Sequence, residues 1–197
     1  MFKLGITGGM GSGKSTAAKF FQSKGASIFD ADKEAKRHLL SNIELQKRII
    51  DIFGNQVTRD GCLDLQKLSE YIFSRKQYQD TLNKIIWPEV YKLIKSASEQ
   101  AACVNTDLFV VDAALLLESC YTEYFDSILL ITASKSIRIQ RILLRKNIPE
   151  DQIEKRMTLQ MPESEKQKQV PTTIKNNKDV QELYIQLEKF YNNLDAR

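Results

Sequence analysis

The chain has 197 residues, of which 42% are hydrophobic and 27% charged, as in folded globular proteins and unlike disordered or membrane-embedded ones. Its 29 lysines and arginines against 25 aspartates and glutamates give a net charge of +4, which suits an anionic ligand. No aromatic-interleaved basic stripe is present, so we expect no nucleic-acid partner. The first apolar run is too short for a secretory signal or a membrane span, and we expect a cytoplasmic protein with no membrane partner. Three scattered cysteines, Cys62, Cys103 and Cys120, lack metal-ligand spacing and are expected to be reduced thiols.

Short apolar runs alternate with helical patterns along the chain. Residues 2–7 predict a buried strand that leads into a glycine-rich loop, and residues 13–23 predict the helix that follows. A second strand is expected at 27–30, with Asp30 as the N-cap of a helix over 30–40. Continuous apolar runs predict further strands at 108–112 and 127–131. This alternation indicates an α/β fold: a three-layer, doubly wound parallel sheet in a single domain over residues 1–197.

Two helical segments interrupt this alternation. Residues 39–105 are mainly helical in pattern and exceed what one crossover needs, so we interpret them as an inserted substrate-binding subdomain. Within it, a helical pattern over 78–100 is expected to kink or break at Trp87-Pro88. Two charged helices at 134–146 and 150–161 are interpreted as a lid spanning 134–166, and a last helix is expected at 180–194.

The sequence GGMGSGKS at 8–15 fits the pattern G-x-x-x-x-G-K-S, directly after a strand and before a helix. Glycines let the loop turn its N–H groups toward phosphates, and the next helix points its positive end at the same anion. Lys14 is expected to reach the β- and γ-phosphates in a catalytic role, and the Ser15 hydroxyl to bind Mg²⁺. The candidate nucleotide-binding residues are Gly8, Gly9, Met10, Gly11, Ser12, Gly13, Lys14, Ser15 and Thr16.

This motif indicates a fold of the phosphate-loop (P-loop) nucleoside triphosphate hydrolase type, which kinases share with ATPases, GTPases and motors. The chain has no N-K-x-D guanine motif and is short for a motor, so a kinase that uses ATP and Mg²⁺ to phosphorylate a small molecule is the best reading. The acceptor could be a nucleoside, a nucleotide or another metabolite. A regulatory module that binds nucleotide without transferring phosphate is the alternative from another class.

Carboxylates follow two of the predicted strands. Asp30 and Asp32 come at the end of the second strand, beside the glycine loop, and Asp32 is the candidate base because Asp30 is expected to cap the helix. Asp112 ends the third strand, where P-loop proteins place an acidic partner of Mg²⁺ or water. We therefore expect Ser15 at the metal, with Asp32 or Asp112 as its partner through water.

Arg138, Arg141 and Arg145 are spaced three and four residues apart, which places them on one helical face. On a mobile lid, Arg141 and Arg145 are expected to reach the ATP phosphates and act in catalysis, whereas Arg138 is expected to stay solvated. Arg156 could join them from the second lid helix. A merely solvated basic face is the alternative.

Taken together, these residues resemble the dephospho-coenzyme A kinase family. The resemblance runs over most of the chain, through the segments 5–16, 30–32, 60–64, 115–118, 140–145, 156–161 and 174–176. It implies ATP-dependent phosphorylation of the ribose 3′-hydroxyl of dephospho-coenzyme A, the last step of coenzyme A biosynthesis, with Asp32 as base. It also implies a core, a helical substrate domain, a lid, and an adenine-binding loop near Asn176.

Several residues depart from the usual pattern of that family. They are Trp87, Ala114, Val170-Pro171, Lys175 and Lys178. These positions belong to the expected substrate domain and adenine loop, so they bear on substrate affinity and nucleotide preference. Among other candidates, Glu118 could serve the acceptor pocket, Trp87 is read as a packing or pocket aromatic, and His38 as solvated surface. The oligomeric state is open, with a monomer favoured.

Overall fold

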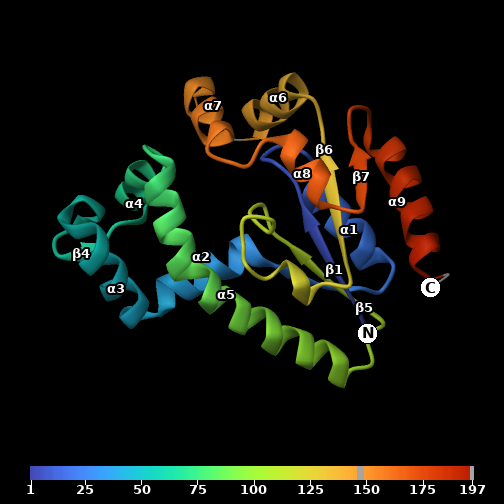
Figure 1. The fold of residues 1–197 in the computed structure, drawn as a ribbon, viewed down its shortest axis with the longest axis horizontal. Helices are drawn as coiled ribbons and strands as arrows, with labels where there is room; N and C mark the ends of the chain where they lie inside the picture. The colour runs from blue at the N-terminus through green and yellow to red at the C-terminus, as the bar shows by residue number, and fades with distance from the viewer. Residues whose placement is uncertain (146–148, 196–197) are drawn as a thin grey trace.

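The computed structural model describes residues 1–145 and 149–195, and its core is a parallel sheet (Figure 1). Five strands occur in the order β2-β5-β1-β6-β7: β1 (Phe2–Thr7), β2 (Ser27–Asp30), β5 (Leu108–Asp112), β6 (Ser127–Thr132) and β7 (Thr172–Lys175). All four pairings are parallel. The predicted α/β fold with a doubly wound parallel sheet is confirmed, as are its four predicted strands, whereas the edge strand β7 was not predicted.

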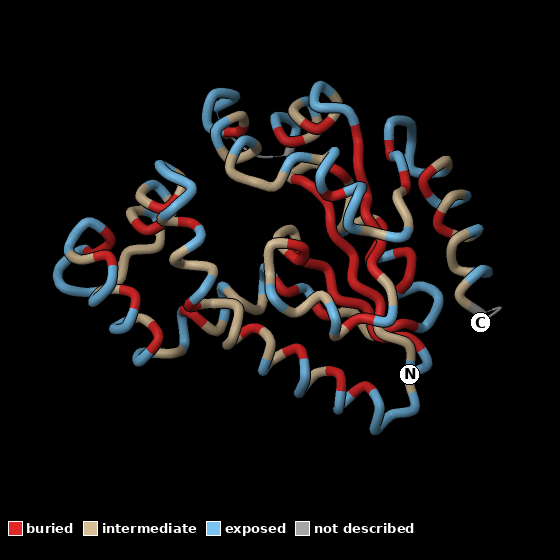
Figure 2. Tube along the Cα trace, in the orientation of Figure 1, coloured by how far each residue is buried: buried red, intermediate tan, exposed pale blue. Residues whose placement is uncertain are grey.

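The strands of this sheet consist largely of buried residues (Figure 2), and their side chains belong to two core clusters, one on each face. On one face Leu4, Ile6 and Val110 pack with α1 (Lys14–Ser23) and α9 (Val180–Asp195). On the other face Phe109 and Val111 pack with α5 (Lys76–Cys103). Because successive strand residues alternate between faces, an apolar run with no polar gaps places core residues on both sides and makes three layers.

The long segment between β2 and β5 has a core of its own. It contains α2 (Ala31–Ser41), α3 (Ile43–Phe53), the 3₁₀ turn η1 (Gly54–Val57), the strands β3 (Thr58–Arg59) and β4 (Cys62–Leu63), α4 (Leu65–Ile72) and α5. The two short strands form an antiparallel hairpin that was not predicted. Its turn is made by Asp60 and Gly61, both with positive φ, the backbone that two-residue hairpins require.

Helix α5 continues through Pro88, so of the predicted outcomes, a kink or a break, the break is wrong. Proline removes one helical hydrogen bond, which costs about 3 kcal/mol in an unsupported helix. Here Ile85 lies buried on the N-terminal side of the proline, and Val90 and Ile94 lie buried on its C-terminal side. Burial of each such side chain contributes about 1.5–3 kcal/mol, enough to hold both halves of the helix in register.

Between β6 and β7 the described residues form three helices: α6 (Lys135–Arg145), α7 (Glu150–Thr158) and α8 (Glu163–Gln169). The last of these was not predicted, and α7 ends earlier than the expected residue 161. A short 3₁₀ turn, η2 (Thr122–Tyr124), precedes β6. In the described parts of the chain, no helix combines the length and the apolarity needed to cross a membrane. The three cysteines are free and exposed, as expected for reduced thiols.

Candidate active site

The glycine loop lies between the end of β1 and the start of α1, as its pattern predicted. Gly13 adopts a φ of +104° at the N-cap of α1, and an added Cβ there would collide with the Asn176 side chain. Gly8 also has positive φ, and its Cβ would collide with the carbonyl of Ile131 in the neighbouring strand. Glycine is therefore required at both ends of the loop by backbone conformation and by space. The first turn of α1 carries no acidic residue, which leaves its positive end unopposed for an anion.

Asp112 is the buried carboxylate of the site. It lies at the end of β5, opposite Asp30 in the register with β2, and is only 5% exposed. The pKa of Asp112 is raised to about 6, chiefly by burial and also by the neighbouring charges of Asp32 and Asp30, while Lys14 and a hydrogen bond with Ser15 oppose the rise. Its Oδ1 atom has no hydrogen-bond partner among the described residues. Asp112 Oδ1 is therefore available to bind a ligand near Lys14 and Ser15.

A carboxylate oxygen and a hydroxyl are hard oxygen donors, the kind that Mg²⁺ prefers. Mg²⁺ in nucleotide sites is held by one or two such groups, with substrate phosphates and waters supplying the rest. Within residues 1–145 and 149–195, no three acidic, histidine or cysteine side chains converge as a metal cage would require. The pair formed by Ser15 and Asp112, with its spare Oδ1, fits a phosphate-bound cation.

The two aspartates after β2 have different surroundings. Asp30 is the N-cap of α2, where its Oδ1 accepts a hydrogen bond of 3.0 Å from the backbone N–H of Lys33, as predicted. Asp32 lies in the first turn of that helix, is exposed, and its Oδ2 accepts a 3.3 Å hydrogen bond from the N–H of Ala114. Asp30 is thus the helix cap, whereas Asp32 is held beside the loop after β5; the role of Asp32 as base stays a prediction.

Asp32 lines a cavity of about 360 Å³ formed by α2, α4 and α5. Leu115, just after Ala114, also lines it. Its other walls are mostly apolar and aromatic, with a few polar groups: Ala35, Lys36, Leu68, Ile72, Phe73, Gln79, Leu82, Asn83, Ile86, Trp87 and Val90. A largely apolar hollow with few polar groups is the usual form of a small-molecule site. The reading of Trp87 as a pocket aromatic is confirmed.

The structure corrects the prediction for Arg138. Instead of being solvated, this side chain is buried at 6% exposure and packs against the glycine loop. Its Nε donates to the carbonyl of Met10 over 2.9 Å, and Nη1 donates to Glu163 Oε1 over 2.8 Å. Glu163 Oε2 accepts a further hydrogen bond of 2.6 Å from Thr132 Oγ1. Arg138 and Glu163 therefore join α6, α8 and the end of β6 to the phosphate loop.

Replacing Arg138 with alanine is expected to lower the free energy of unfolding by about 2 kcal/mol, because Glu163 would lose its cation in a partly buried site. Arg138→Lys is expected to lose the bond to Met10 and to destabilise by a smaller amount. Lys135→Ala is the matched control, since its ion pair with Glu154 joins side chains that are 64% and 46% exposed. Urea unfolding measures all three; equal curves for Arg138→Ala and Lys135→Ala would contradict the structural role.

The other predicted arginines have separate environments. Arg141 donates to the carbonyl oxygens of Asn176 and Lys178, both over 3.0 Å. The side chain of Arg145 lies outside the described residues. Arg156, on α7, lies over the ring of Phe73, the residue that follows α4, at 4.8 Å from the ring centroid, which brings α7 onto a wall of the cavity. The catalytic roles of Arg141 and Arg145 stay predictions.

Asn176 is buried and fastens the loop after β7 to the phosphate loop. Its Nδ2 donates to the carbonyl of Ser12 over 2.8 Å, and its backbone N–H donates to Thr132 over 2.7 Å. The Asn176 side chain thus positions the segment in which the resemblance implies adenine binding, and the contact with the nucleotide itself stays a prediction.

Three residues of the site were not assigned by sequence reasoning. Gln160 accepts a hydrogen bond of 3.2 Å from the N–H of Met10 through its Oε1, a contact that its place in the sequence did not predict. Lys166 is completely buried, with Nζ 3.3 Å from both Glu118 Oε1 and the carbonyl of Ala114. Glu163 was overlooked because an acidic residue after a proline is the usual start of a surface helix.

Comparison with known proteins gives one consistent result. The sequence model of the dephospho-CoA kinase family matches residues 2–182. A protein named dephospho-CoA kinase from Fusobacterium nucleatum is 34% identical, and the alignment covers 95% of this chain and 95% of that one. Another of the same name from Salinibacter ruber is 32% identical, with 97% of this chain and 96% of that one covered. The crystal structure of TT1252 from Thermus thermophilus is 28% identical with a TM-score of 0.78, covering 99% of this chain and 96% of that one.

More distant solved structures share the fold. Dephospho-CoA kinase from Campylobacter jejuni is 24% identical with a TM-score of 0.66, covering 98% of this chain and 96% of that one. Shikimate kinase from Acinetobacter baumannii is 14% identical with a TM-score of 0.54, covering all of this chain and 96% of that one. The fold is therefore that of the P-loop kinases, and since the family model and relatives above 30% identity span nearly the whole chain, this protein belongs to the dephospho-CoA kinase family.

Proposed function

We propose that the protein transfers the γ-phosphoryl group of ATP to the ribose 3′-hydroxyl of dephospho-CoA, giving CoA and ADP in the last step of CoA biosynthesis. The observation that carries this proposal is the position of Asp32, which lines the apolar cavity and is hydrogen-bonded to the loop after the strand of Asp112. A hydroxyl held in the cavity beside Asp32 has a carboxylate within reach, and Asp112 couples electrostatically to both Asp32 and Lys14.

In this reaction the 3′-hydroxyl oxygen attacks the γ-phosphorus while Asp32 accepts the hydroxyl proton. The bond from the γ-phosphorus to the bridging oxygen breaks, and ADP leaves with the electron pair. The N–H groups of the glycine loop hold the β-phosphate, and Lys14 neutralises charge that spreads over the oxygens of the migrating group. Arg141 and Arg145, on the lid, are proposed to complete this charge stabilisation when the lid excludes water.

Ser15 and Asp112 are proposed to hold Mg²⁺ with the ATP phosphates, Asp112 acting through water. When bound, Mg²⁺ neutralises negative charge on the β- and γ-phosphates. The unpartnered Oδ1 of Asp112 supports this role, because a buried carboxylate oxygen without a partner is costly in the free protein. A bound cation would compensate the cost of burying this oxygen, which supports the assignment of Asp112 to the cation.

Asp112→Asn is expected to stabilise the nucleotide-free protein at pH 8 by about 1–3 kcal/mol while reducing activity. Burial raises the pKa of Asp112 in the folded protein to about 6, from an ordinary value of 3.8. The folded state then binds the proton more tightly than the unfolded chain, so the cost of ionisation is absent below pH 3.8 and complete above pH 6. Urea unfolding at pH 4 and pH 8 is the measurement. A variant no more stable than the wild type at pH 8 would contradict this reading.

The test of the proposed function is a coupled assay of ADP release with a panel of acceptors: dephospho-CoA, adenosine, uridine and shikimate. We expect turnover with dephospho-CoA and little with the other three, since adenosine lacks the diphosphate and the pantetheine arm and uridine and shikimate lack the adenosine as well. Faster turnover of shikimate or a nucleoside would assign the chain to another acceptor. A rate of ADP release that is the same with and without each acceptor would indicate simple ATP hydrolysis.

A further inference from the structure

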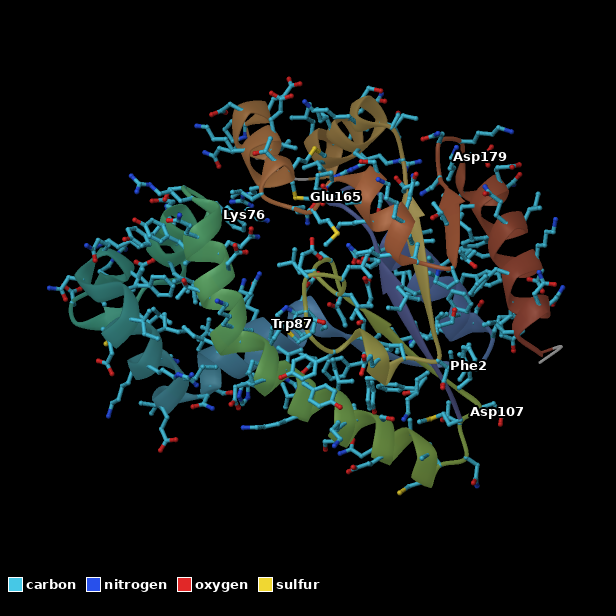
Figure 3. All side chains as sticks on the ribbon, viewed as in Figure 1. Phe2, Lys76, Trp87, Asp107, Glu165 and Asp179 are labelled. Carbon is cyan, nitrogen blue, oxygen red and sulfur yellow. The ribbon has the colours of Figure 1, made fainter. Side chains whose placement is uncertain are left out.

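A second cavity, of about 370 Å³, adjoins the first across the middle of α5. Asn83 and Trp87 of α5 line both cavities, and Trp87, labelled in Figure 3, lies in the middle of that helix. The far wall of the second cavity is the loop between β5 and η2, from Glu118 to Tyr121. A molecule anchored in the first cavity can therefore continue past Trp87 into the second.

The proposed acceptor is long enough to need both cavities. Ligand sites for drug-sized molecules range from about 300 to 1,000 Å³, and the first cavity alone lies near the lower limit. Dephospho-CoA consists of an adenosine, a diphosphate and a pantetheine arm. Once the ribose lies beside Asp32, the adenine and the pantetheine arm extend from it in different directions, and the first cavity has room for one of them.

The charges of the second cavity favour the pantetheine arm over the diphosphate. Of its charged lining residues, Asp80 and Glu118 are acidic and Lys84 is basic, so the wall is negative on balance. Oε2 of Glu118 is buried and has no hydrogen-bond partner among the described residues. The arm is uncharged and carries two amide N–H groups and a hydroxyl, which are donors for such an oxygen. Lys36 in the first cavity and Lys84 in the second can attract the diphosphate on either side of the junction.

The wall that would receive the arm is held in place by aromatic stacking. The Tyr121 ring stacks on Tyr91 of α5, with centroids 4.1 Å apart, and lies 6.4 Å from the Trp87 ring. Glu118 accepts a hydrogen bond of 3.1 Å from the N–H of Met161 and pairs with the buried Lys166. A pocket whose walls are fixed before binding costs less ordering entropy to fill.

We propose that the second cavity binds the pantetheine arm of the acceptor, with the arm passing Asn83 and Trp87 and lying against Glu118 and Cys120. This inference rests on the proposed function and specifies which part of that substrate each cavity holds. It predicts that binding of the whole acceptor covers Cys120, whereas an acceptor without the arm leaves it accessible.

The coverage of Cys120 by the acceptor can be measured directly, because Cys120 lines the second cavity while the other exposed cysteines, Cys62 and Cys103, do not. The intact protein, with a non-hydrolysable ATP analogue bound, is alkylated with iodoacetamide, and each cysteine peptide is followed by mass spectrometry. S-methylated dephospho-CoA is expected to slow alkylation of Cys120 severalfold and to leave Cys62 and Cys103 unchanged, while 5′-AMP protects none of them. Unchanged alkylation of Cys120 with bound S-methylated dephospho-CoA would overturn the proposal.

Filling the cavity gives an independent test. Cys120→Phe is expected to raise KM for dephospho-CoA about tenfold and to leave KM for ATP unchanged, since a bulky ring would displace the arm. Cys62→Phe, at an exposed hairpin position, is the matched control and should change neither constant. A wild-type KM in Cys120→Phe would refute the arm subsite while the proposed function stands. Absence of wild-type turnover with dephospho-CoA would refute the proposed function itself.

Discussion

Lys14→Ala is expected to lower kcat by about 10³-fold, with little change in the free energy of unfolding. Lys14 occupies the lysine position of the loop motif at the first position of α1, and its charge lowers the pKa of Asp112. The lysine neutralises charge on the phosphoryl group that grows in the transition state. Its side chain is only partly buried and belongs to none of the hydrophobic clusters, which is why stability should survive its removal.

Steady-state kinetics with saturating ATP and dephospho-CoA measures this effect. Lys19→Ala is the matched control, because Lys19 lies on the exposed side of the same helix. It should keep wild-type kcat and unfolding. A Lys14→Ala variant with turnover near that of Lys19→Ala would remove Lys14 from the mechanism.

Asp32→Asn is expected to lower kcat by about 10²- to 10⁴-fold, because the amide has the shape of the carboxylate but cannot accept the hydroxyl proton. KM for ATP should stay near its wild-type value, since Asp32 belongs to the acceptor side of the site. The hydrogen bond from Ala114 to Oδ2 can be kept by the amide oxygen, so the loop after β5 should keep its position.

Asp30→Asn provides the comparison for this prediction. Asp30 caps α2, and asparagine is an equally good N-cap residue, so the variant should keep both its stability and its turnover. The reverse pattern, with a severe loss in Asp30→Asn and a mild one in Asp32→Asn, would exchange the roles of the two aspartates.

The features that could be predicted from the sequence are those that local chemistry determines. The glycine loop has a fixed motif, because few residues tolerate positive φ beside a neighbouring strand, as Gly8 shows. The predicted cap at Asp30 follows from a short acidic side chain placed before a helix. Two of the four predicted strands, at 108–112 and 127–131, are continuous apolar runs, which central strands of a sheet covered on both faces require.

The features that were missed depend on contacts between distant residues. Pro88 stays inside a helix because Ile85 and Val90 are held by packing that the local sequence does not reveal. Strand β7 has a mixed polar sequence and is recognisable only by its pairing with β6. Arg138 has the same helical spacing as Arg141, yet one is buried against Met10 and the other contacts the backbone of Lys178. The helical spacing of these arginines predicts that they share a face of α6, but it does not reveal which residues they contact.

The central claim is that the 3′-hydroxyl of dephospho-CoA receives the phosphoryl group beside Asp32. The most direct measurement is ³¹P NMR of the product formed from dephospho-CoA and ATP by the wild-type protein, with the amount of ADP determined in the same sample. We predict a single new phosphate monoester on C3′ of the ribose, equal in amount to the ADP formed. A phosphate on C2′, or ADP without a new monoester, would contradict the account.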